Sequence, residues 1–353
     1  MTSTPMITVL MPVYNGELYI RYAIDSILCQ SFKDFELLIV NDASTDRTVE
    51  IIESYTDSRI RLVHNEINLK HGVALNRGLE LAQGQYIARM DSDDISCPAR
   101  LEKQKIFLDS NQNVALVGSW AEIIDEKGNA RGIKTFLTNS PLLKWKLLFC
   151  NTFIHSSIMF RKSCVLPLLG YDCNYALAED YDLWSRISFE HEVANIPEVL
   201  VKWREWGGSV TSTKAKEQQK ETLKISRRNM QHVWGETIDI HVLESFKLLY
   251  SGVKADFSNK RMNELVSHRN VLIDRFIEKY NYEDRSVVKN LRVEITTHLF
   301  SLIIRANNTW PVKLKQLFVW LVKIKPNIVR AFYIFLFKRT IFGSRIRKLF
   351  YIK

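Results

Sequence analysis

The chain has 353 residues, 46% hydrophobic and 25% charged, a composition that suits a globular protein of one large or two modest domains. Its five cysteines are scattered without a C-x-x-C pair, which argues against a zinc site or disulfide scaffold and for reduced thiols in a cytoplasmic protein. The net charge of +10 is concentrated near the C-terminus, so it describes a tail and not the whole surface.

Apolar strand patterns alternate with helical patterns in the N-terminal part. We expect strands at residues 7–11, 35–40, 60–63 and 85–90, and helices at residues 17–30 and 73–82. This alternation predicts an α/β fold with a mainly parallel sheet and helices on both faces. Ligands of such sheets bind beyond the carboxyl ends of the strands. Tyr14, Asp42 and Asp91 each follow a predicted strand, so we expect them to converge on one crevice.

The pattern changes after residue 213. Up to that point we expect helices at residues 98–108 and 181–189 and strands at 114–117, 156–160 and 199–203. Beyond it, Gly and Pro become sparse and long polar helical patterns dominate. We therefore predict an α/β domain over residues 1–213 and a helical region over residues 214–353.

Three carboxylates lie within four residues at the end of the fourth predicted strand. Asp91, Asp93 and Asp94, with Ser92 among them, repel one another unless a cation or specific hydrogen bonds hold them. Hard oxygen ligands suit Mg²⁺ or Mn²⁺, and such ions often bridge protein carboxylates to substrate phosphates. The pattern predicts a metal–diphosphate site. Its alternative is a solvated acidic turn or a helix start before Pro98.

The loops after the first two strands offer groups that could contact a nucleoside. No G-x-G-x-x-G or G-x-x-x-x-G-K-[ST] occurs, which disfavours a dinucleotide-binding dehydrogenase and a P-loop nucleotidase. The first strand leads instead into Pro12, Val13 and Tyr14, and the aromatic ring could stack on a base. Asp42 could accept a hydrogen bond from a base or ribose. The alternatives are packing for Tyr14 and a turn or cap role for Asp42.

An ordered series of motifs resembles glycosyltransferase family 2. The matching segments are VLMPVYN (9–15), QSF (30–32), FELLIVNDASTD (35–46), ALNRG (74–78), YIARMDSDD (86–94), HSSIMFR (155–161) and AEDYDLW (178–184). Together they cover about residues 6–210. One departure is Ala43, where the family often has Gly. The difference matters little if the backbone there is ordinary.

The resemblance implies a GT-A fold, a Rossmann-like sheet flanked by helices, and inverting, metal-dependent transfer from a nucleotide-diphospho-sugar. A UDP-sugar is the expected donor. Residues 12–14 and Asp42 would contact the nucleoside. Asp91, Ser92 and Asp93 would form the D-x-D motif. Within it, Asp93 would be the main ligand of Mg²⁺ or Mn²⁺, and Asp91 would lie toward the ribose or the metal's waters.

Asp180 would then be the general base that takes the proton of the incoming hydroxyl. Attack from the face opposite the diphosphate inverts the anomeric centre, so one base suffices and must stand apart from the metal. Asp180 could also cap the helix at residues 181–189, and both roles can coexist. On the acceptor side, Glu179 could orient the acceptor or simply begin this helix. His155 could contact diphosphate or acceptor, or be a satisfied structural residue.

Other polar residues near these motifs are expected to be structural. Lys70 and Arg100 could reach a phosphate, but we interpret both as ordinary surface ions. Asp94 is expected to sit at a helix start, and Trp184 in the core.

The resemblance favours addition of one sugar to a glycan or lipid-linked acceptor in surface-polysaccharide synthesis, such as O-antigen or capsule. Processive relatives usually carry a Q-x-x-R-W motif and transmembrane helices, and the sequence shows neither. One rival is a sugar-nucleotide nucleotidyltransferase, which usually has a Gly-rich, basic loop that residues 14–17 lack. Another is a non-catalytic, membrane-docked scaffold on the same fold, disfavoured by retention of Asp91, Asp93 and Asp180.

The C-terminal tail carries the basic charge. Residues 310–353 contain seven Lys, four Arg and no acidic residue, which leaves a net charge of about −1 for the rest of the chain. Apolar stretches at 317–321 and 331–337 suit interfacial helices on anionic lipid, peripheral on the inner face of the cell membrane. The alternative is a packed helical subdomain. No signal peptide is expected, no apolar run spans a bilayer, and no motif supports nucleic acid as partner.

The full-length protein should pellet with anionic liposomes at low salt, because each basic residue near such a surface contributes about 1 kcal/mol. Removing residues 310–353 should abolish pelleting. Unchanged pelleting of the truncated chain would contradict membrane binding by the tail.

Overall fold

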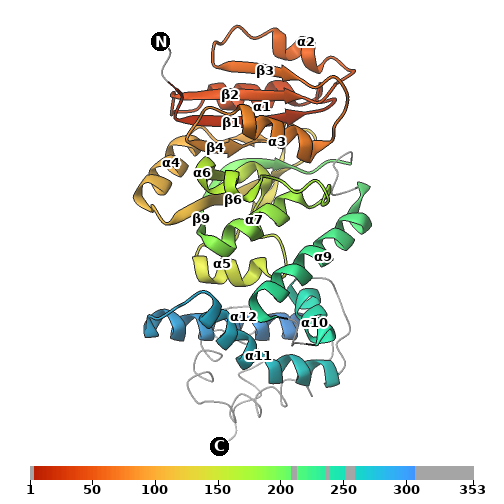
Figure 1. Cartoon of the computed structure of the whole chain (residues 1–353). Coiled ribbons are helices and arrows are strands. Elements are labelled where there is room, and N and C mark those ends of the chain that lie inside the picture. The colour runs from red at the N-terminus through yellow and green to blue at the C-terminus, as the bar shows by residue number, and fades with distance from the viewer. Residues whose placement is uncertain (1–3, 208–212, 236–238, 251–258, 307–353) are drawn as a thin grey trace, which may run out of the picture. The chain divides into compact units, whose positions relative to one another are not determined.

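The computed structural model describes residues 4–207, 213–235, 239–250 and 259–306 (Figure 1). The chain divides into two compact units after His232. The first unit therefore extends beyond residue 213, and the predicted functional boundary there stays a prediction. The proposed membrane segment, residues 310–353, lies outside the described residues.

Within residues 4–207, nine strands form one mixed sheet in the order β3-β2-β1-β4-β8-β6-β9-β5, with β7 paired to β6. The strands are β1 (Ile7–Val13), β2 (Phe35–Asn41), β3 (Ile60–His64), β4 (Tyr86–Arg89), β5 (Ile95–Ser96), β6 (Val114–Ile124), β7 (Ala130–Lys134), β8 (Met159–Arg161) and β9 (Glu192–Arg204). The first four strands by sequence are mutually parallel, whereas β8 runs antiparallel between β4 and β6. The predicted α/β class is confirmed.

Helices cover both faces of this sheet (Figure 1). In the first unit they are α1 (Ile20–Leu28), α2 (Thr48–Glu53), α3 (His71–Leu81), α4 (Arg100–Ser110), α5 (Ser140–Leu147), α6 (Lys162–Val165), α7 (Glu179–Glu190) and most of α9 (Ala215–Trp234), with 3₁₀ turns η1 (His155–Ser157) and η2 (Leu166–Leu168). Side chains along β1 point alternately to the two faces of the sheet, where two separate cores lie. Val9 and Met11 pack with α1 and α4 on one face, and Leu10 packs with α3 and α7 on the other.

Some predicted boundaries were wrong. The helix predicted from residue 17 begins at Ile20, because the amides of Tyr19 and Ile20 first form a turn on the carbonyl of Gly16. Strand β7 was not predicted, since every residue in it is exposed and the strand carries no apolar alternation.

The second unit contains helices in its described part: α10 (Ile240–Tyr250), α11 (Asn259–Lys279) and α12 (Arg285–Ala306). Phe246, Phe276 and Leu291 are buried in it. The predicted C-terminal helical region is thus confirmed. Among the described helices, none combines the length and apolarity that crossing a bilayer requires.

The backbone at Ala43, two residues after the end of β2, is not ordinary. Its φ of 62° lies in the left-handed region, where a side chain costs about 1–2 kcal/mol and Gly costs little. The condition under which Ala would matter little, an ordinary backbone, is therefore not met.

Ala43→Gly should raise the free energy of unfolding by about 1 kcal/mol, because relief of this strain exceeds the added flexibility of the unfolded chain. Urea unfolding measures the change. Ala130→Gly, exposed in β7 without a positive φ, is the control and should lose about 0.5–1 kcal/mol. Equal losses in both variants would contradict the strain argument.

Candidate active site

The loops after β1, β2 and β4 meet at one edge of the sheet, as the sequence predicts. The amide of Asp42 donates to the carbonyl of Val13 (2.8 Å), which joins the ends of β1 and β2. The loop after β1 also lies against the acidic loop, since a Cβ added at Gly16 would come within 3.4 Å of Ser92 Oγ. Tyr14, at the same edge, is 50% exposed. A ligand at this edge can therefore reach residues from separate strands.

Asp42 is buried and organises the loop that leads into α3. Its carboxylate accepts hydrogen bonds from Asn65 Nδ2 (2.6 Å) and from the amides of Leu69 and Lys70 (both 2.9 Å). These bonds satisfy three acceptor positions and account for the burial of the charge. Contact of Asp42 with a base stays a prediction, and so does stacking on Tyr14.

A buried guanidinium, Arg89, lies at the end of β4 beside the acidic cluster. Its Nη1 pairs with Asp91 and donates to Ser156 Oγ (3.3 Å). Its Nη2 donates to His71 Nε2 (2.8 Å). Burial acts to raise the pKa of Asp91, but the charge of Arg89 outweighs it and holds that pKa well below its usual range. Asp91 is therefore ionised, and the charge of Arg89 balances its own.

Asp93 and Asp94 have raised pKa values, in contrast to Asp91. Burial, and then the charge of Asp91, raise the pKa of Asp93. The pKa of Asp94 is raised well above its usual value by burial and by the other two carboxylates. One oxygen of Asp93 accepts from Trp206 Nε1 (2.9 Å), and Asp94 Oδ1 accepts from the amide of Arg204 (2.8 Å). The described residues supply no hydrogen bond to Asp94 Oδ2, which is buried.

This donor set fits a hard divalent cation. One carboxylate oxygen from each of Asp91, Asp93 and Asp94 lies within 4.8 Å of the others. Carboxylate oxygens are ligands that Mg²⁺ and Mn²⁺ prefer, and a cation among them would relieve the repulsion that raises the pKa values of Asp93 and Asp94. The residues predicted as metal ligands, Asp93 and Asp91, are thus placed together.

Two structural expectations near the cluster were wrong. Asp94 does not begin a helix, since β5 follows it and α4 starts only at Arg100. Arg100 is not a surface ion: its guanidinium is buried and donates to the carbonyls of Arg89 (2.7 Å) and Ile158 (3.0 Å). Lys70 is exposed, as expected, and Trp184 is in the core.

Asp180 lies in the first turn of α7. Its side chain accepts hydrogen bonds from the Tyr181 amide (2.6 Å) and from Asn151 Nδ2 (2.7 Å). The helix cap is Ala178, so Asp180 does not take the N-cap position that was its alternative role. Burial, and then the charge of Glu179, raise the pKa of Asp180 to about 7. A carboxylate with this pKa can accept a proton near neutral pH.

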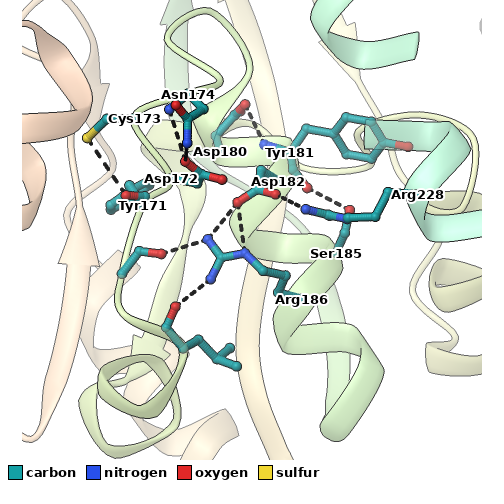
Figure 2. A network of polar contacts seen from close by, with 12 residues as sticks. Tyr171, Asp172, Cys173, Asn174, Asp180, Tyr181, Asp182, Ser185, Arg186 and Arg228 are labelled. Atoms are coloured by element: carbon teal, nitrogen blue, oxygen red, sulfur yellow. Dashed lines mark hydrogen bonds and ion pairs between the residues drawn. The ribbon is translucent and has the colours of Figure 1, made fainter. Parts of the chain in front are cut away.

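Ion pairs of the buried Asp182 carboxylate with two half-buried arginines anchor α7. Figure 2 shows Asp182 between the guanidinium groups of Arg186 and Arg228. Arg186 also donates to the carbonyls of Leu168 and Gly170 (both 2.7 Å). These contacts join α7 to α9 and to the segment that precedes α7. They fix the orientation of the turn that carries Asp180.

The two acceptor-side candidates differ in their surroundings. Glu179 is buried and its Oε1 lies 2.6 Å from His71 Nδ1. His155 Nε2 lies 3.1 Å from the Tyr171 hydroxyl, and its ring packs edge-on against His71 and Trp184. Burial lowers the pKa of His155 well below its usual value, so the ring is neutral. This geometry favours the structural interpretation of His155, and substrate contact by either residue stays a prediction.

The sequence interpretation missed Arg89, His71, Asn151 and Trp206. For Arg89 a signal was present, because a charge inside the apolar run of a buried strand requires a partner. The other three contact the site only through the tertiary fold, so local patterns gave no signal.

Known proteins resemble this chain in sequence and fold. The profile of "Glycosyl transferase family 2" matches residues 8–166. An uncharacterized glycosyltransferase of Haemophilus influenzae is 34% identical over 313 residues, covering 83% of this chain and 96% of the relative. The O-antigen biosynthesis glycosyltransferase WbnJ of Escherichia coli is 36% identical over 205 residues, 56% of this chain and 79% of WbnJ. Staphylococcus aureus TarS 1–349 in complex with UDP-GlcNAc shares the fold, with a TM-score of 0.55 at 16% identity over 81% of this chain and 89% of TarS 1–349.

Asp93→Asn should stabilise the metal-free protein by about 1 kcal/mol, because it removes a repelling charge and keeps an acceptor for Trp206. The same change should abolish the rise in melting temperature that Mn²⁺ causes in the wild type. Thermal unfolding with and without Mn²⁺ measures both effects.

Asp34→Asn is the matched control, since Asp34 is exposed at the opposite end of β2. It should leave the Mn²⁺ response unchanged. A full Mn²⁺ response in Asp93→Asn would contradict the metal assignment.

Proposed function

This chain belongs to glycosyltransferase family 2, and we propose that it transfers a single sugar, with inversion, from a nucleotide-diphospho-sugar to a hydroxyl of a glycan or lipid-linked acceptor. One observation carries this proposal. A carboxylate poised to accept a proton, Asp180, stands in the same compact unit as an acidic cluster that fits a divalent cation. No direct contact joins them among the described residues. An inverting transfer needs both parts and needs them apart.

The donor side would be the edge formed by the loops after β1, β2 and β4. Asp93 and Asp91 would hold Mg²⁺ or Mn²⁺, and the bound ion stabilises negative charge on the leaving diphosphate. Arg89 keeps Asp91 ionised and fixed in place. Tyr14 is accessible for stacking on the base. UDP-GlcNAc, the ligand in the TarS complex, is the first donor to test, and a UDP-sugar is our proposed donor class.

The acceptor side would be the first turn of α7. Asp180 would remove the proton of the attacking hydroxyl, and a base is most effective when its pKa lies near the working pH. Asn151 holds the carboxylate through one oxygen. Glu179 raises its pKa by repulsion and would also orient the acceptor.

The name of WbnJ, a relative 36% identical, supports surface-polysaccharide synthesis as the process. We propose residues 1–213 as the transferase domain, with the tail holding the enzyme at the inner face of the membrane. Release of free nucleoside diphosphate in a metal-dependent assay over a panel of nucleotide sugars tests the reaction. Release of pyrophosphate would indicate nucleotidyl transfer instead, and no turnover with any donor would favour a scaffold.

Asp180→Asn should lower turnover by about 10²–10⁴-fold and leave donor binding intact, because it removes the base and keeps the shape. Steady-state kinetics and calorimetric titration of the donor measure the two effects. Turnover equal to that of the wild type would contradict the assignment.

The rate of the wild type should rise with pH and level off above about 7, since only the ionised form of Asp180 accepts a proton. Glu179→Gln removes a repelling charge and should move this limb to lower pH. Asn151→Ala removes a hydrogen bond that stabilises the ionised form and should move it to higher pH. Shifts in the same direction would contradict Asp180 as the titrating group.

A further inference from the structure

We propose that His71 is a positioning residue of the transfer reaction, which holds the α7 turn carrying Glu179 and Asp180 in register with the Arg89–Asp91 pair on the donor side. The inference rests on the proposed function. It concerns a residue that lies outside the acidic cluster and the base, yet touches a group on each side.

The contacts of His71 define its protonation. Arg89 Nη2 lies 2.8 Å from His71 Nε2, and a guanidinium nitrogen can only donate. Nε2 must therefore be the acceptor, which leaves the ring proton on Nδ1. Nδ1 lies 2.6 Å from Glu179 Oε1 and donates to it. The hydrogen-bond network thus assigns a neutral, Nδ1-protonated imidazole. Asp91 Oδ1, at 3.9 Å from Nε2, is beyond hydrogen-bonding distance.

The start of α3 is itself held in place. His71 is the first residue of α3, and the preceding residue, Lys70, has a φ of 77°. The amides of Leu69 and Lys70 both donate to the buried carboxylate of Asp42. Asp42 therefore fixes the turn from which the imidazole projects. The imidazole thus connects the end of β4 to the first turn of α7, and Asp42 joins the turn that carries it to the end of β2.

This arrangement would set the distance between base and donor. Glu179 is buried and adjacent to Asp180 in the first turn of α7, so a hydrogen bond to Glu179 restrains both residues. The loss of an angstrom of accuracy at a catalytic group can reduce turnover by about 10²-fold. Breaking the bond from His71 to Glu179 should therefore lower kcat more than it changes the KM for the donor.

Three substitutions separate this role from packing. The amide nitrogen of Asn occupies the place of Nδ1, so His71→Asn keeps a donor for Glu179. His71→Gln reaches the place of Nε2 and keeps the contact with Arg89. His71→Leu keeps neither. We expect kcat to fall about 10–100-fold in the Gln and Leu variants and less than about fivefold in Asn, with the donor KM within about threefold throughout.

Melting temperatures of the three full-length variants provide the control for folding. If kcat instead follows the melting temperature across the series, or if Asn loses as much as Gln, the positioning role is wrong. If the wild type is active and all three variants have its kcat, the positioning role of His71 is wrong and the proposed function is unaffected. A wild type that releases no nucleoside diphosphate from any donor overturns the proposed function, and the catalytic role of His71 with it.

The tautomer gives a readout that needs no activity. Nitrogen-15 NMR of the full-length protein with labelled histidine, with the His71 signal identified by its loss in His71→Asn, should show a protonated Nδ1 and an unprotonated Nε2. The opposite tautomer or an imidazolium would overturn the bridge.

Discussion

The site depends on a guanidinium that has no access to water. Arg89 ends a central strand of the sheet, and burial of an unpaired cation there would cost several kcal/mol. Its charge is balanced by Asp91, its Nη1 also donates to Ser156, and its Nη2 donates to His71. Arg100, also buried, donates a hydrogen bond to the Arg89 carbonyl. The positions of these groups are therefore coupled, and a change in one leaves a buried polar group without its partner.

The same ion pair accounts for an asymmetry within the acidic cluster. Arg89 lowers the pKa of Asp91, whereas burial and the neighbouring carboxylates raise the pKa values of Asp93 and Asp94. We therefore expect a bound cation to be centred on the Asp93 side of the cluster. Asp94 is best understood as part of this electrostatic environment and as the acceptor that fixes the end of β9 through the Arg204 amide.

Sequence reasoning reached the features that depend on local order. Strand ends follow from apolar runs, so the shared edge of Tyr14, Asp42 and Asp91 could be predicted. The motif resemblance selected Asp93 and Asp180. Contacts between distant segments could not be predicted from the sequence. His71 contacts Glu179, 108 positions away in the chain, and Trp206 contacts Asp93, 113 positions away. The left-handed backbone of Ala43 also escaped prediction, because only the fold imposes that φ.

In the reaction that we propose, one base, Asp180, acts from the side opposite a metal-bound diphosphate. The most direct measurement is proton NMR of the sugar first released when water serves as acceptor, before its anomers equilibrate, with an α-linked nucleotide-sugar donor and Mn²⁺. We expect the β anomer to be released first, because a single displacement inverts the anomeric centre. Initial release of the α anomer would contradict it.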